Sequence, residues 1–126
     1  MDTATLELPM SGPAASRPVD LVHLSRVTFG DRALEREVLG LFLRQSAIHL
    51  DRLKEARTAQ DFSAAAHTLK GSAQGIGARH VAMVAAEAEA LAASHDTAEV
   101  FEVVARLEAR VAECRLYISH LLSGGH

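Results

Sequence analysis

The chain has 126 residues, enough for one domain with a single core, and its 48% hydrophobic but only 4% aromatic residues favour a core of aliphatic side chains and alanine. The formal net charge of −3 excludes the strongly basic footprint that is typical of nucleic-acid-binding proteins. A single cysteine, Cys114, excludes an internal disulfide and fits a reducing compartment.

The beginning of the chain, residues 1–18, contains all the prolines and lacks the apolar run of a signal peptide, which predicts a flexible N-terminal tail. No segment reaches the roughly 20 apolar residues that a membrane helix needs. We therefore expect a cytoplasmic protein with no membrane partner and no nucleic-acid partner. The folded unit should span residues 19–123, with residues 124–126 as a C-terminal tail.

A short helix is predicted to begin near Val19 and to end at Gly30. Asp31 then has the chemistry of an N-cap for a long helix over residues 32–57. One face of this long helix is apolar at helical spacing, which predicts that it faces the core. That face consists of Leu39, Phe42, Leu43, Ser46, Leu50 and Leu53.

A second apolar stripe lies on nearly the opposite side of the long helix. Leu34, Leu41 and Ile48 recur every seven residues there, with Val38 between the two stripes. The stripe either packs against the short first helix or another helix, or forms an exposed patch to which a partner docks. The sequence leaves both interpretations open.

Two shorter helices are predicted next. Asp61 is the expected N-cap of a helix over residues 62–76, and Gly77 is well placed to end it. The following helix is expected over residues 78–93, with a turn before Asp96.

The last helix has a 4-3-4-3 rhythm of apolar residues, which is typical of a seam in an antiparallel bundle. The seam consists of Val100, Val104, Leu107, Val111, Cys114, Ile118 and Leu121. Cys114 on this seam is interpreted as a small buried hydrophobe. The chain is therefore predicted to be all-α, an antiparallel up-down four-helix bundle with a short additional N-terminal helix.

His67 is the main candidate for a functional residue. At about 100° per residue, it points away from the face that contains Ala66, Leu69 and Ala73, so it should reach solvent. A neutral imidazole is a competent nucleophile near neutral pH and can attack phosphorus without an activating base. The N–P bond that results is labile, so the phosphoryl group can be passed on.

The residues that share the His67 face suit this chemistry. Lys70, Gly71 and Gln74 follow His67 at helical spacings of three, four and seven residues. Lys70 supplies a positive charge for phosphoryl oxygens. Gly71 removes a side chain beside His67, so that a partner's active site can approach closely.

The segment His67-Thr68-Leu69-Lys70-Gly71-Ser72-Ala73, followed by Gly77-Ala78, resembles the motif of histidine-containing phosphotransfer (HPt) domains, and the resemblance extends over about residues 19–122. It implies that His67 accepts a phosphoryl group through Nε2, that Lys70 stabilises this group and that Gly71 gives clearance. Gln74 and Arg79 are accessory candidates through their position alone. The stripe of Leu34, Val38, Leu41 and Ile48 would then be the docking patch.

The resemblance also implies a partner. The chain would relay a phosphoryl group between aspartates in the receiver domains of response regulators or hybrid histidine kinases, and the receiver would supply Mg²⁺ and an acidic pocket. Neither a metal-binding cluster nor a Walker motif is found in the sequence, so we expect the chain to have no cofactor and no ATP-dependent kinase activity of its own. We also expect the chain to be a monomer. The alternative is an HPt-like docking module that binds a receiver or kinase without carrying phosphate.

Overall fold

The computed structural model describes residues 17–124 and contains, within that range, five helices and no strand. The helices are α1 (Leu21–Val27), α2 (Arg32–Glu55), α3 (Ala59–Ile76), α4 (Arg79–Ala90) and α5 (Thr97–Ser123). The predicted all-α class is confirmed. None of the described helices combines the length and the apolar character needed to cross a membrane.

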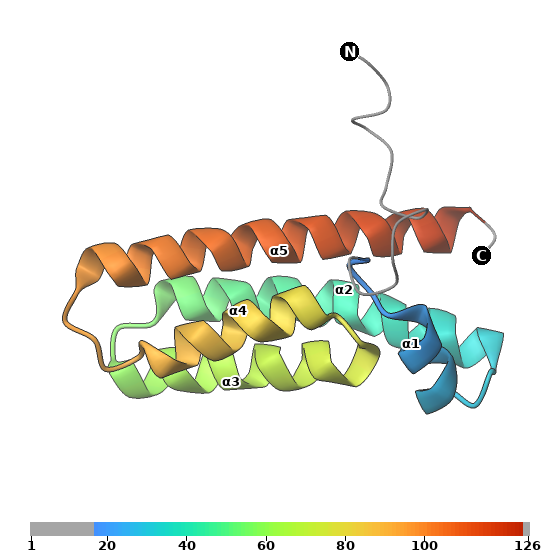
Figure 1. Cartoon of the computed structure of the whole chain (residues 1–126), viewed down its shortest axis with the longest axis horizontal. Coiled ribbons are helices and arrows are strands. Elements are labelled where there is room, and N and C mark those ends of the chain that lie inside the picture. Colours follow the sequence, from blue (N-terminus) through green and yellow to red (C-terminus); the bar gives the residue numbers. More distant parts are fainter. Residues whose placement is uncertain (1–16, 125–126) are drawn as a thin grey trace, which may run out of the picture.

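The four longer helices form an antiparallel bundle in which each packs against the next, and α5 also packs against α2 (Figure 1). Because the connections are short, neighbours in the sequence are neighbours in space. The short helix α1 lies across one end of the bundle and packs against α3 (Figure 1). The bundle and its additional N-terminal helix therefore agree with the prediction.

Asp31 caps α2, as predicted, since its side chain accepts a backbone N–H bond there. Asp96, one of two candidates together with Thr97, caps α5 in the same way. Asp20 caps α1, for which no cap was predicted.

The prediction for α3 is wrong. Thr58 caps this helix, since its Oγ1 accepts from the Asp61 N–H at 3.0 Å, and α3 begins three residues earlier than expected. Threonine and aspartate both favour the N-cap position, so the sequence alone did not separate the two candidates.

Three helices end earlier than predicted. The helix α1 ends at Val27, three residues before the expected end at Gly30. The backbone becomes extended at Ala56, so α2 ends at Glu55 and not at residue 57. The helix α4 covers Arg79–Ala90 rather than residues 78–93. Its start at Ala78 has no side-chain cap bond, and no glycine marks its end, so the sequence carried no clear signal for either boundary.

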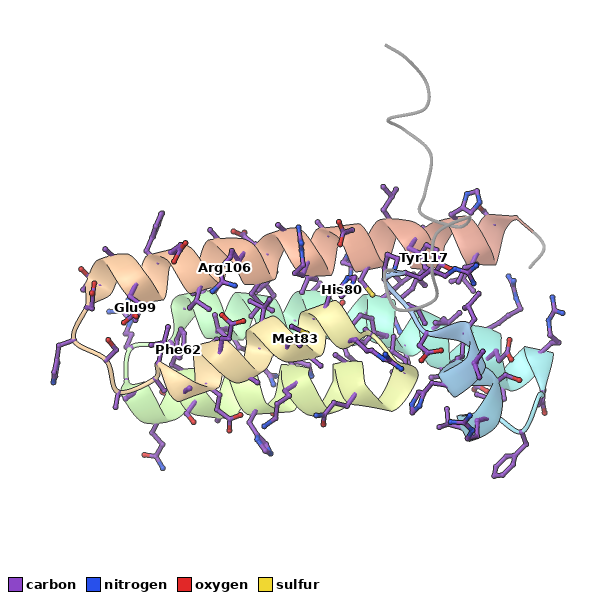
Figure 2. All side chains as sticks on the ribbon, viewed as in Figure 1. Phe62, His80, Met83, Glu99, Arg106 and Tyr117 are labelled. Carbon is purple, nitrogen blue, oxygen red and sulfur yellow. The ribbon has the colours of Figure 1, made fainter. Side chains whose placement is uncertain are left out.

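The core contains the predicted apolar faces, with two changes in α5. Val103 and Tyr117 are fully buried although neither belongs to the predicted seam, whereas Val100 and Val104 are only partly buried. Tyr117 lies toward the end of the bundle that α1 covers (Figure 2). The seam is therefore wider than a strict 4-3-4-3 rhythm, because α5 packs against both α4 and α2.

Cys114 is buried, as predicted, and its Sγ lies 3.8 Å from the carbonyl oxygen of Pro18. Burial raises the pKa of the Cys114 thiol to about 12, so the thiol stays protonated and behaves as a hydrophobe. Pro18 is buried as well, so the packed part of the chain includes this residue of the predicted tail. The remainder of the two predicted tails, residues 1–16 and 125–126, lies outside the described residues.

Candidate functional site

His67 lies in the middle of α3, and its side chain is 67% exposed. The helix turns this side chain outward because Ala66 and Leu69 on either side are completely buried in the core. The outward orientation predicted from the sequence is therefore what the structure shows.

Glu89 of α4 bonds to both His67 and Lys70. One carboxylate oxygen, Oε2, lies 2.9 Å from His67 Nδ1, and the other, Oε1, lies 2.9 Å from Lys70 Nζ. The Lys70 ammonium, followed by the His67 ring, holds the pKa of the Glu89 carboxyl below its usual value. Glu89 is therefore ionised near neutral pH, and its carboxylate forms the centre of a three-residue cluster.

This contact determines which nitrogen of His67 carries the proton. An ionised carboxylate only accepts hydrogen bonds, so in the neutral imidazole Nδ1 must hold the hydrogen that points at Glu89 Oε2. Nε2, on the other edge of the ring, then keeps its lone pair. The cluster thus presents a nucleophilic Nε2 on an exposed ring.

The α3–α4 hairpin brings Glu89 to His67. Gly77 ends α3 with φ +81°, a left-handed conformation that suits glycine, and α4 then runs back along α3. His67 precedes Gly77 by ten residues and Glu89 follows it by twelve, so the two residues lie at similar heights along the hairpin. The sequence reasoning missed Glu89, although the register of the predicted hairpin could have found it.

Gly71 is exposed on the same helix, one turn after His67. A Cβ atom placed on Gly71 would meet nothing within 4 Å, so no internal contact requires glycine there. The absent side chain leaves the surface beside His67 low, which is the effect expected for a residue that gives clearance.

Gln74 and Arg79 lie in different surroundings. Gln74 is exposed on α3, one turn beyond Lys70. Arg79 does not belong to the Glu89 cluster, because its Nη2 pairs with Asp20 Oδ2 at 2.7 Å. The Asp20 N–H also donates to the Gly77 carbonyl at 2.9 Å, so this contact attaches α1 to the α3–α4 turn.

The second apolar stripe of α2 divides into two parts. Leu34 and Val38 are partly buried and line a groove of about 330 Å³ together with Val27 and Thr28, next to α1. Leu41 and Ile48 are 48% and 43% exposed. One end of the stripe thus lies near α1, whereas Leu41, which also borders the groove, and Ile48 are open to solvent. The docking of a partner on this exposed part stays a prediction.

The groove also borders the site. Its α3 wall consists of Gly71, Ser72, Gly75 and Ile76, and Gly71 lies one turn from His67. The groove therefore extends from α1 to within one helical turn of His67. Within residues 17–124, no group of three or more His, Cys, Asp or Glu side chains is arranged to hold a metal ion.

The fold and the site together define a four-helix bundle that displays an oriented, exposed imidazole beside a lysine. The comparison with family models agrees with this class: the model of the Hpt domain matches residues 37–119. The chain therefore belongs to the Hpt domain family, whose members carry phosphoryl groups in phosphorelays, where they interact with receiver domains. Comparisons with curated proteins and with solved structures gave no match.

Proposed function

We propose that this chain relays a phosphoryl group between aspartates of receiver domains, through a phosphohistidine at Nε2 of His67. The observation that carries the proposal is the bond between Glu89 and His67 Nδ1, because it leaves the lone pair on the exposed nitrogen. A surface histidine without such a partner would have no fixed tautomer. Membership of the Hpt family supports the same chemistry.

No proton has to move during the proposed transfer step. The Nε2 lone pair attacks the phosphorus of an aspartyl phosphate, the N–P bond forms, and the P–O bond breaks so that the aspartate leaves as a carboxylate. Nδ1 keeps its hydrogen, and the positive charge on the ring faces Glu89. Mg²⁺ and the acidic pocket would come from the receiver domain.

Lys70 has a second task in this proposal. An ammonium group has three donors, so Lys70 can remain bonded to Glu89 Oε1 and still donate to a phosphoryl oxygen. Its position one turn after His67 on the same face suits that contact. Gly71 gives the receiver room to approach.

The receiver would dock over the groove beside Gly71 and over the exposed part of the α2 stripe, where Leu34, Val38, Leu41 and Ile48 provide apolar contacts. The chain would act as a monomeric carrier without ATP-dependent kinase activity of its own. Hpt domains in general are carriers and not kinases.

A transfer assay with matched His67 variants tests the proposal. The full chain is mixed with phosphorylated receiver domains from the same organism, and label that is acid-labile and base-stable is expected on the wild type and absent from His67→Gln. Label on the His67→Gln protein would show that His67 is not the acceptor. If the wild type binds a receiver without taking label, and His67→Ala binds equally well, the chain is a docking module instead.

A further inference from the structure

We infer that Glu89 also acts after phosphorylation: it keeps the proton on Nδ1 of phospho-His67, so that the ring leaves as neutral imidazole and the phosphoryl group is passed on quickly. This inference rests on the proposed function of His67. It makes Glu89 a positioning residue, because it acts through the ring and not on the phosphoryl group.

The geometry favours a durable contact. The Glu89 side chain is 27% exposed, and its two oxygens are both occupied, one by His67 Nδ1 and one by Lys70 Nζ. Lys70 thus holds the carboxylate in place with Oε2 directed at the ring. Phosphorylation at Nε2 adds its group to the opposite edge of the imidazole, so the bond between Nδ1 and Glu89 can persist.

The protonation state of Nδ1 decides how good a leaving group the ring is. When Nδ1 carries hydrogen, the P–N bond breaks, its electron pair returns to Nε2, and the product is a neutral imidazole. The acceptor carboxylate forms the new O–P bond, and no proton has to move. Without that hydrogen the ring would have to leave as an imidazolate anion, which is far less stable.

A neighbouring anion favours the protonated ring. An opposite charge within about 4–6 Å stabilises the charged form of a titrating group by the equivalent of roughly one to three pH units. After phosphorylation the ring with hydrogen on Nδ1 is cationic, and Glu89 lies in direct contact with it. The labile form of the phosphohistidine should therefore persist to higher pH than it would without Glu89.

Other charged groups around His67 make less direct contacts. On α3 itself, Lys70 bonds to Glu89. A groove beside Thr68 is lined by charged residues of both signs, namely His49, Arg52 and Glu55 of α2, Arg57 of the connection, and Asp61 of α3. From α1, His23 Nε2 lies 3.3 Å from the Gly75 carbonyl oxygen, two turns along α3. Glu89 is the acidic side chain bonded to the ring.

Chemical phosphorylation tests the inference without a receiver. The full chain is incubated with phosphoramidate, a small donor that phosphorylates histidine, and loss of the phosphoryl group is followed by ³¹P NMR from about pH 5 to about pH 9. Wild type is compared with Glu89→Gln and with the control Glu87→Gln. Glu87 lies on the same helix but pairs with Arg106 of α5 at 2.6 Å, so its replacement removes the same charge from a different place.

For Glu89→Gln we expect the fall of the rate with pH to occur about one unit lower than in the wild type. Above both transitions, the loss should then be about tenfold slower in Glu89→Gln than in the wild type, whereas in acid the two rates should be equal. Glu87→Gln should follow the wild type. A Glu89→Gln profile equal to that of the wild type overturns the inference and leaves His67 as the acceptor. An equal slowing at every pH overturns it too, because the charge would then act on the phosphoryl group and not on the Nδ1 proton. The signal to follow is the one that is missing from His67→Gln, because the chain has seven histidines and phosphoramidate can react with others. Failure of the proposed function is seen separately, as label on His67→Gln in the transfer assay with a receiver domain.

Discussion

Individual contacts at Glu89 explain why an exposed histidine is not an ordinary surface residue. The ring is 67% exposed, which permits a partner to reach it, yet its Nδ1 edge is bonded to a carboxylate. An exposed side chain usually has no fixed orientation, since it samples many rotamers. Here Lys70 and Glu89 orient the ring from one side only, and the reactive nitrogen stays open.

The ion pair between Lys70 and Glu89 gives a prediction about the titration of a single residue. Replacing Lys70 with alanine removes the largest cause of the lowered pKa of Glu89, so the carboxyl should titrate at a higher pH than in the wild type. A ¹³C NMR titration of the glutamate carboxyl carbons measures this shift. Glu87, which pairs with Arg106, serves as the internal control and should not move.

The sign of the effect on stability follows from linkage. A carboxyl whose pKa is lowered in the folded state stabilises the fold above its unfolded pKa, and this contribution is lost as pH falls through the folded pKa. The stability lost in Lys70→Ala should thus appear at neutral pH and disappear in acid. An unchanged Glu89 titration in the variant would mean that the ion pair is not formed in solution.

The start of α3 provides a prediction for a single helix. Thr58 Oγ1 accepts from the Asp61 N–H, whereas Asp61 contributes only a negative charge in the first turn. Thr58→Ala should lower the free energy of unfolding by about 1 kcal/mol. Asp61→Ala should lower the free energy of unfolding by about 0.5 kcal/mol, and added salt should reduce this effect because it screens the charge. Urea denaturation compares the two variants, and the reverse order would restore Asp61 as the cap.

The helices themselves were predictable because their patterns are local. Apolar spacing in α2 and α5, Gly77 and the aspartate caps specify most of the bundle. Errors arose where two signals compete within a few residues, as at Thr58 and Asp61, or where no signal exists, as at the ends of α4. Such boundaries depend on tertiary packing, and the spacing of apolar residues along one helix gives no information about these contacts.

The site was predictable only as far as it lies on one helix. His67, Lys70 and Gly71 are neighbours along α3, so their common face follows from helix geometry. Glu89 comes from α4, and its contact depends on the register of two antiparallel helices. Arg79 illustrates the opposite case, since it is close to the motif in the sequence but bonds to Asp20 at the junction with α1.

Two glycines have different roles when the whole molecule is considered. Gly77, which follows α3, is required by the fold, whereas Gly71 within α3 is proposed to give room to a partner. A Cβ atom on Gly77 would lie 3.1 Å from both Cβ and the carbonyl oxygen of Asp20, and the residue has φ +81°. Gly77→Ala should therefore lower the free energy of unfolding by about 1–2 kcal/mol and loosen α1. Amide hydrogen exchange in α1 would detect the loosening, and unchanged protection there would show that α1 is held by other contacts.

Gly71 has the opposite relation to stability. Its Cβ position is open, and alanine in a helix interior is more favourable than glycine by up to roughly 1 kcal/mol. Gly71→Ala should thus raise the free energy of unfolding in urea denaturation while it slows phosphoryl transfer from a receiver domain, because the added methyl group projects from the surface beside His67. Phosphorylation by phosphoramidate, which is small, should remain as fast as in the wild type.

Gly75→Ala is the matched control for this last prediction. Gly75 lies one further turn along α3, in the wall of the same groove, and a Cβ atom there also meets nothing within 4 Å. Because Gly75 is the penultimate residue of α3, alanine there should stabilise the fold in the same direction but by less. Being farther from His67, it should slow transfer from a receiver less than Gly71→Ala does. If Gly71→Ala is stabilised and transfers at the wild-type rate, close approach at Gly71 is not required for transfer. A selective loss of transfer in the more stable protein would show that the fold accepts a weaker helix at this position in exchange for access to the imidazole.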